Sequence, residues 1–337
     1  MKKSLLALAA LTAFAGVASA QSSVTLFGLV DLSLRSQKTG TNSTQTMVPN
    51  GHSSSRLGVR GVEDLGGGMR AVFWIEGDMS ADDGTAAGQM WRRRSTVSVM
   101  GGFGEIRLGR DYTPSFWNHT VFDPFGANGV GSALNTVSTL GSGATTLVRA
   151  NNSVGYFLPA MGGLYGQVQI AAGENVTGNK YTGLRVGYAA GPANVAIGWG
   201  NTKRTGAMLD DFTDINVGGS YKMGAFTLMG QYAKSDYLAS SQKNALVGAT
   251  MAVGAGTLRA SYIRATGSQS SFEANQVALG YVHNLSKRTW LYTTYARLKN
   301  EGTAATGARF VTSGSAGAAA AGGLSSTGYE FGLAHSF

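Results

Sequence analysis

Polar and apolar residues alternate along most of this chain with a period of two. Segments of about ten residues show the alternation and are separated by clusters of Gly, Asn, Ser and Thr, which is the pattern of half-buried β-strands. No helical period of 3.6 residues persists after the first twenty residues. The sixteen predicted strands are approximately 23–37, 53–64, 68–78, 91–101, 104–112, 150–160, 163–173, 181–190, 193–202, 212–223, 225–236, 243–253, 256–266, 274–286, 288–299 and 326–337.

The connections between the predicted strands alternate in length. Seven are short and turn-like, for example "GGFG" and "KMGA", and the other eight are longer and rich in Gly, Ser, Thr and Asn. Nothing in a soluble sandwich requires this alternation. Outer-membrane barrels, in contrast, have short turns on one side, long loops on the other and an even number of strands. The loop pattern therefore favours a membrane barrel.

The two faces of the predicted strands differ in charge. One register is apolar, and the other carries nearly all charges except Arg93 and Arg264, which lie near strand ends. A basic residue facing lipid at mid-bilayer costs roughly 2–4 kcal/mol, whereas one facing a wet lumen costs little. A soluble sheet with one wet face would also alternate. The alternation therefore indicates a membrane barrel only in combination with the number of strands and the unequal loop lengths. The charged residues of the predicted lumen register are Asp31, Arg35, Arg56, Arg60, Arg70, Glu76, Arg92, Arg94, Glu105, Arg107, Arg185, Lys222, Arg259, Arg297 and Glu330.

These patterns predict an all-β fold, a 16-stranded antiparallel transmembrane β-barrel. Lipid offers no hydrogen bonds, so the first strand should pair with the last and leave no open edge. The last segment, "STGYEFGLAHSF", alternates up to its aromatic end. Aromatic residues near strand ends are expected in the interfacial girdles, or otherwise in a core. The candidates are Trp290, Tyr292 and Phe337.

The first twenty residues predict a signal peptide, residues 1–20, followed by a barrel over residues 21–337. Lys2 and Lys3 begin it, an apolar run follows, and Ala18-Ser19-Ala20 supplies small residues for cleavage. The run is too short for a membrane helix, and no later stretch approaches the roughly 18 apolar residues that one needs. The chain is therefore expected to be exported.

Composition narrows the class of partner. Removing Lys2 and Lys3 leaves 25 basic and 18 acidic residues, a net charge of +7. Such a balance suits nucleic acid, a membrane surface or small anions, and export argues against nucleic acid. The absence of cysteine excludes disulfides. No residue constellation indicates a metal or another cofactor; Asp78, Asp82 and Asp83 lack the EF-hand spacing.

The longest internal connection, about residues 112–149, is expected to be an inward-folded constriction loop. Loops longer than about 12–15 residues are usually functional or disordered. This one holds four aromatic residues that are too apolar for a solvated loop, and packing against the inner wall of a wide barrel would bury them. The alternative is an external loop with its own small cluster. The residues are Phe116, Trp117, Phe122 and Phe125.

Arginines gather near the starts of the second, fourth and sixth predicted strands. These strands run in one direction, so their arginines should lie at similar height on one stretch of wall. Water in the pore lowers the repulsion between them, and their field would attract anions. The alternative is that nearby carboxylates neutralise them. The predicted pore-lining basic cluster is Arg56, Arg60, Arg92, Arg94 and Arg149, with Glu76 and Asp123 as pore acids and Arg93 left at the rim or against a neighbour.

Several segments resemble the general-diffusion porins of Gram-negative outer membranes, and most of all the anion-favouring porins of β-proteobacteria. The likeness covers essentially the whole chain after the signal. The segments are "SVTLFGLVD", "SSRLGVRGVEDLGGG", "FWIEGD", "GGFGEIRLGRDY", "DPFG", "RANNSVGYFLP" and "GLAHSF".

The resemblance implies a homotrimer of sixteen-stranded barrels, each with a constriction loop after the fifth strand. It places the family's basic cluster on Arg56, Arg94 and Arg149 and its wall glutamate on Glu76, and it sets Arg110 at a subunit interface. Phe337 resembles the signal read by the barrel-assembly machinery. Two departures are Leu29, where many porins have lysine, and Asp123, which is displaced by one position in "DPFG". Fewer loop acids should favour anions further.

The leading hypothesis is passive diffusion of small hydrophilic solutes through the outer membrane, with small anions preferred. Outer-membrane lipid and lipopolysaccharide are the expected surroundings. A substrate-selective channel for phosphate or carboxylates is the alternative. A barrel hydrolase is a remote one, because the chain has four histidines and no Gly-x-Ser-x-Gly segment. We therefore expect a channel and not an enzyme.

Overall fold

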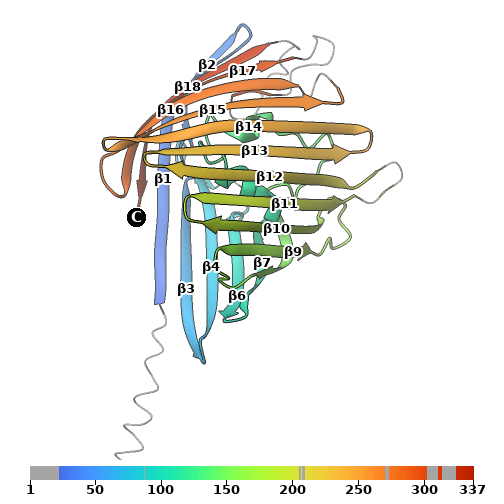
Figure 1. Cartoon of the computed structure of the whole chain (residues 1–337). Helices are drawn as coiled ribbons and strands as arrows, with labels where there is room; N and C mark the ends of the chain where they lie inside the picture. The colour runs from blue at the N-terminus through green and yellow to red at the C-terminus, as the bar shows by residue number, and fades with distance from the viewer. Residues whose placement is uncertain are drawn as a thin grey trace, which may run out of the picture.

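The computed structural model describes residues 23–86, 88–204, 206, 209–269, 273–301, 310–312 and 324–337, so the predicted signal peptide lies outside the described residues. Sixteen antiparallel strands form one barrel wall, as the alternation predicted (Figure 1). The wall strands are β1 (Ser23–Thr39), β3 (Arg56–Gly66), β4 (Met69–Ser80), β6 (Arg94–Gly101), β7 (Gly104–Tyr112), β8 (Arg149–Phe157), β9 (Leu164–Ala171), β10 (Lys180–Ala190), β11 (Ala193–Lys203), β12 (Phe212–Met223), β13 (Phe226–Tyr237), β14 (Ser240–Val253), β15 (Gly256–Gly267), β16 (Ala274–Asn284), β17 (Thr289–Asn300) and β18 (Ser325–Ser336).

The barrel closes through its first and last strands. β1 pairs with β18 from Leu29↔Ser336 to Thr39↔Ser326, and with β3 along its first seven residues. Closure leaves no open edge in the wall, as a lipid environment requires. Two short strands stand outside the wall: β2 (Asn42–Pro49) extends the external end of β1, and β5 (Thr85–Ala86) pairs with the end of β4.

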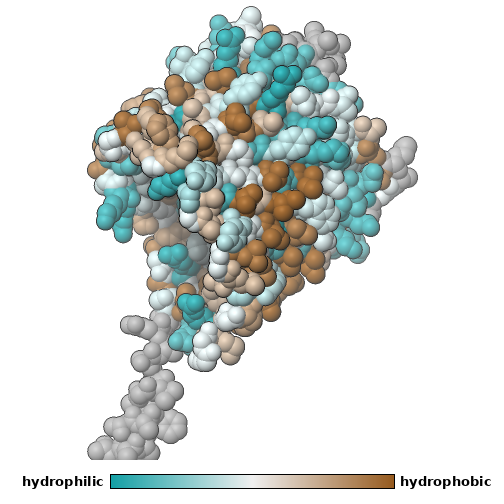
Figure 2. All heavy atoms as spheres, viewed as in Figure 1, coloured by the Kyte–Doolittle hydropathy of each residue, from teal (hydrophilic) through white to brown (hydrophobic). Residues whose placement is uncertain are grey.

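Polar side chains lie inside the barrel and apolar side chains outside it. On β16, Gln276 is 0% exposed, whereas Val277 and Leu279 are 51% and 56% exposed. The same alternation runs around the wall, and Figure 2 shows apolar side chains gathered on its outer face. This distribution suits hydrocarbon outside and water inside. Exposed apolar residues of the wall include Val24, Leu26, Val97, Val99, Ile106, Leu108, Val168, Ile170, Val186, Val195, Ile197, Leu228 and Phe331.

Three predicted side-chain directions on β17 are wrong. Tyr292 faces the lumen, is 2% exposed and donates its hydroxyl hydrogen bond to Asp31. Trp290 lies in the same register and lines a hollow inside the barrel with His52, so neither ring belongs to a girdle. Arg297 is exposed on the outer face, in register with the lipid-facing Val277. The segment "WLYTTYARL" has aromatic residues in both registers, so its pattern does not define which face is apolar. Among the described residues, no helix is both long and apolar enough to span a bilayer.

The connection between β7 and β8 folds into the barrel. It contains the helix α2 (Pro114–Val121) and the 3-10 turn η1 (Ala133–Thr136). α2 packs against β9 to β12, which follow β8 around the wall, and η1 packs against β15 and β16 on the opposite wall. The predicted inward loop is therefore present and narrows the lumen.

Candidate pore constriction

Polar contacts fix the inner loop to the far wall. Asn118 donates to Asn216 Oδ1 at 2.8 Å and to the Ala196 carbonyl at 3.2 Å, and it accepts from Arg185 Nε at 2.7 Å. Farther along the loop, Val130 N–H donates to Glu330 at 3.1 Å. All of these partners come from the lumen face of the wall. Their side chains hold the loop across the pore rather than outside it.

Apolar packing supports the same position of the loop. Phe116, Phe122 and Phe125 are 4%, 0% and 2% exposed, and Phe125 packs with Val130 against β16 and β17. Gly218 on β12 lets the Phe122 ring reach the wall, because a Cβ there would lie 2.2 Å from the ring. Trp117 differs from the other three rings. It remains half-buried and faces the channel side of the loop.

A hollow of about 560 Å³ lies between the loop and the wall formed by β1, β3, β4 and β6. Arg56 and Arg94 are the first residues of β3 and β6, and Arg149 is the first residue of β8. These strands run in one direction, so the three arginines lie at the same end of their strands. The charged residues that line the hollow are Arg56, Arg60, Arg93, Arg94, Glu76 and Asp111.

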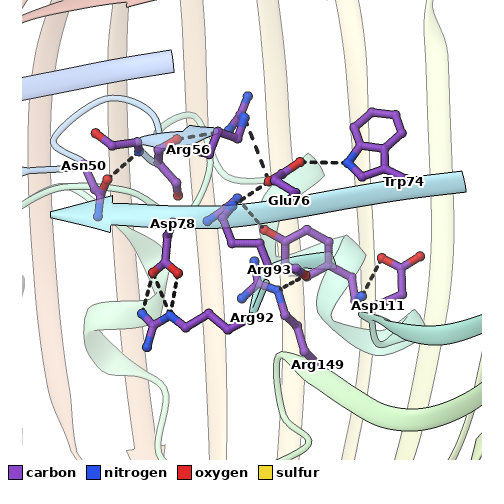
Figure 3. Close-up of polar contacts among 12 residues, drawn as sticks. Asn50, Arg56, Trp74, Glu76, Asp78, Arg92, Arg93, Asp111 and Arg149 are labelled. Carbon is purple, nitrogen blue, oxygen red and sulfur yellow. Dashed lines mark hydrogen bonds and ion pairs between the residues drawn. The ribbon is translucent and has the colours of Figure 1, made fainter. Parts of the chain in front are cut away.

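Arg93 lines the hollow, whereas Arg92, which was predicted to line the pore, is not among the residues of the hollow. β6 begins at Arg94, so strand parity does not extend to the two preceding arginines. Arg93 is 9% exposed and donates to Glu76 at 2.5 Å, and its main-chain carbonyl accepts from Arg149 Nε at 2.8 Å. Arg92 points away and forms a two-oxygen ion pair with Asp78 (Figure 3).

The carboxylates in the hollow balance only part of the positive charge. Glu76 contacts Arg93 and, at 3.9 Å, Arg56. Asp111 lies 3.6 Å from Arg94 and 2.6 Å from Arg107. Asp111 was not among the predicted site residues, although "GRDY" contains it; its role depends on a β-bulge next to it that no alternation pattern reveals. Four arginines and two carboxylates line the hollow, so its field is positive.

Asp123, the second predicted pore acid, is hydrogen-bonded to the backbone of the inner loop. It is 3% exposed, and its two oxygens accept the backbone N–H groups of Phe125, Ala127 and Ala133 at 2.8–3.0 Å. Burial raises the pKa of the Asp123 carboxyl group, while the three N–H donors and Arg259 act in the opposite direction. Its oxygens are therefore used to shape the loop.

Aromatic rings cover the faces of several arginines. Arg94 lies 4.5 Å from the centre of the Trp74 ring, and Arg149 lies 4.1 Å from the centre of the Tyr112 ring. Arg60 lies over both Trp74 and Phe27. A ring against the face of a guanidinium leaves its N–H edges free to donate in the ring-free directions. No pattern in the sequence marked these rings as part of the site.

A second hollow of about 450 Å³ lies on the other side of the loop, next to β15 to β17. Arg259 and His52 meet there, with Arg259 Nη1 3.1 Å from His52 Nδ1. Burial and the neighbouring Arg259 lower the pKa of His52 to about 4. His52 is therefore neutral at pH 7 and accepts the hydrogen bond from Arg259.

The closed barrel, its polar lumen and the loop across it define a pore-forming protein of the membrane-barrel class. A profile of the Gram-negative porin family matches residues 7–303. Outer membrane porin protein 32 of Delftia acidovorans is 40% identical over 356 aligned residues that span all of both chains. An outer membrane porin protein of Bordetella pertussis is 31% identical over 70% of each chain. A solved structure, the anion-selective porin from Comamonas acidovorans, is 36% identical, covers 94% of this chain and 100% of that chain, and superposes with a TM-score of 0.86.

The chain belongs to the Gram-negative porin family. It is an outer-membrane channel through which small hydrophilic solutes diffuse passively, and it is not an enzyme.

Proposed function

We propose that this porin prefers anions. The observation that carries the proposal is the excess of arginine over carboxylate in the constriction hollow, where Arg56, Arg93 and Arg94 face only Glu76 and Asp111. The similar porin from Comamonas acidovorans is anion-selective, which supports the same preference. Rings of basic side chains select anions in pores because they lower the electrostatic cost of an anion there and raise that of a cation.

The inner loop contributes the size limit, and the cluster contributes the sign of charge. An anion that leaves bulk water at the constriction loses part of its hydration. The guanidinium N–H groups replace those water contacts, and no catalysis or energy input is needed. Glu76 and Asp111 fix the positions of the arginines, because each carboxylate contacts two of them and screens their repulsion.

The reversal potential in a potassium chloride gradient tests this proposal. Wild-type protein in planar bilayers should favour chloride, and Arg94→Glu should shift the reversal potential toward potassium. Lys243→Glu is the matched control, because Lys243 is exposed on the outer face of β14 and should leave selectivity unchanged. Equal reversal potentials for wild type and Arg94→Glu would contradict the proposal.

A channel selective for one class of anion is the alternative function. Phosphate or carboxylates would be the substrates, and the observation that favours it is a hollow lined by rings as well as charges. Block of the chloride current that saturates with the concentration of one anion would distinguish this channel from a simple filter.

We also propose that the protein is a homotrimer whose β10–β17 side faces lipid. Support comes from the outward residues near the external strand ends. Lys180 lies directly opposite Lys203, and Lys234 directly opposite Lys243, although like charges in such pairs repel; Asp236, 2.8 Å from Lys234, balances one of these four charges. Phosphates of lipid or lipopolysaccharide would relieve that repulsion. The described outward cations of this side are Lys180, Lys203, Lys234, Lys243, Arg264, Arg297 and Lys299.

The β3–β9 side differs and suits contacts between subunits. Among its described wall residues, Arg110 is the one cation on the outer face near the external ends, and its side chain donates to Asn151 and to the Arg92 carbonyl.

Two experiments test the trimer and its lipid-facing side. Cross-linking of unheated protein should give trimers. The double variant Lys234→Glu with Arg264→Glu should reduce the amount of co-purified lipopolysaccharide. A monomer in native membranes would contradict the trimer.

Phe337 directly follows β18, and we propose that it takes part in recognition by the barrel-assembly machinery. Its exposed ring lies over Gly28, where a Cβ would be 2.3 Å from the ring. Phe337→Ser should reduce assembly in cells but not refolding in detergent. Equal assembly of both proteins would contradict this role.

A further inference from the structure

We propose that the constriction hollow binds aromatic carboxylates. Such an anion would place its carboxylate on arginine N–H groups and its planar ring among the aromatic side chains of the same hollow. This inference rests on the proposed anion preference and deepens it, because it names a class of organic anion that the channel should favour over other anions of equal charge.

Two pairs of rings line the hollow. Phe27 and Trp74, from β1 and β4, meet edge to face with their centres 5.1 Å apart. Tyr112 and Trp117, from the end of β7 and the inner loop, meet in the same way at 5.1 Å. All four rings are half-buried rather than packed away. The parts of these rings that the guanidinium groups leave uncovered remain in contact with water, and that exposure is unfavourable. An aromatic solute would cover them.

The arginines beside these rings retain free donors. Within the described part of the chain, the Arg60 side chain has no hydrogen bond or ion pair, and its guanidinium lies 5.2 Å from the Trp74 ring centre and 5.6 Å from that of Phe27. Arg94 donates from Nε to Thr96, and its guanidinium lies 4.5 Å from the Trp74 ring centre. A planar guanidinium edge matches the two oxygens of a carboxylate. Arg60 is therefore the donor most available to a ligand.

The charge of the hollow attracts organic anions. Glu76 and Asp111 line it together with four arginines, so an excess of positive charge remains for a bound carboxylate. Binding sites for small organic molecules commonly have volumes of roughly 300–1,000 Å³, with many apolar groups and a few placed polar ones. The volume of about 560 Å³ and the mixture of four rings with arginine donors fit that description. Inorganic phosphate would use the arginines and leave the rings uncovered.

Block of the chloride current in planar bilayers tests the inference, with sodium benzoate as the probe and sodium acetate as the matched anion without a ring. Benzoate should reduce the current at concentrations where acetate does not, and the block should saturate. Trp117→Ala should weaken benzoate block roughly threefold to tenfold, the contribution expected of one aromatic contact. Trp199→Ala, a matched change on the outer face of β11, should leave the block unchanged.

The outcomes separate this inference from the proposed anion preference. Equal block by benzoate and acetate, or benzoate block that survives Trp117→Ala, would overturn the aromatic site while chloride selectivity persisted. Loss of chloride selectivity in the wild type would overturn the anion preference itself. Trp117→Ala could weaken the block by rearranging the inner loop. Phe27→Leu is therefore a second variant, which removes a ring from the wall and keeps an apolar side chain on β1. It should weaken benzoate block and leave acetate currents unchanged.

Discussion

Arg93 and Glu76 form an ion pair on one wall of the constriction, with Arg93 Nε and Glu76 Oε1 2.5 Å apart. Glu76 also accepts from Trp74 Nε1 at 3.0 Å, so the pair connects the β4 wall to the connection before β6. The main-chain carbonyl of Arg93 in turn accepts from Arg149. This one pair therefore positions charges that come from three separate parts of the chain.

Arg93→Ala should lower the ratio of anion to cation permeability. It removes a positive charge from the hollow and leaves the Glu76 carboxylate free to attract cations or to draw in Arg56. Arg92→Ala is the matched control, because Arg92 is paired with Asp78 outside the hollow. Reversal potentials in a salt gradient provide the measurement. A larger effect of Arg92→Ala than of Arg93→Ala would contradict the assignment of Arg93 to the cluster.

The sequence predicted the wall better than the constriction. Alternation identified sixteen strands to within a few residues, because lipid outside and water inside impose a period of two on every strand. The run "WRRR" was harder, since it crosses from a connection into a strand and parity applies only from Arg94 onward. The far-wall partners of the loop could not be predicted. Asn118 and Asn216 are 98 residues apart, and no local pattern brings them together.

Single cysteines should report the two faces of the wall directly, since the chain has none of its own. Arg60→Cys should react with a membrane-impermeant maleimide in liposomes, because Arg60 lines the water-filled hollow. Leu279→Cys should stay unreacted until detergent is added, because Leu279 is exposed on the outer face of β16. Mass spectrometry of the labelled protein provides the measurement. The reverse order of reactivity would contradict the inside–outside assignment.

Asp123→Ala should increase single-channel conductance. The carboxylate accepts three backbone N–H groups of the inner loop, and without it these buried groups have no acceptor. Each buried donor left unsatisfied costs about 1–3 kcal/mol, so the loop should loosen from the wall. Conductance noise should rise as well. Asp83→Ala, a change in an exposed external turn, is the control, and equal conductance of the two variants would contradict the structural role of Asp123.

Acidification should destabilise the protein through His52, which lies between β2 and β3. Burial and Arg259 lower the pKa of its imidazole in the folded protein to about 4, from an ordinary value of 6.5. Between these pH values the unfolded chain binds the proton and the folded chain does not. The free energy of unfolding is therefore highest above pH 6.5 and falls as the pH drops toward 4, by at most about 3 kcal/mol from this group.

Carboxyl groups of the protein also titrate over this pH range, so a comparison of wild type with His52→Gln isolates the contribution of the imidazole. Glutamine can still accept from Arg259 through its amide oxygen but cannot take up a proton. Unfolding by guanidinium in detergent micelles at pH 7.5 and pH 4.5 should show a larger loss of stability for the wild type. Protonation of His52 in the folded barrel is unfavourable, because its Nδ1–H would point toward the Arg259 guanidinium, 3.1 Å away, and the two cations would repel. An identical pH dependence in both proteins would show that His52 is protonated in the folded barrel without loss of the Arg259 contact.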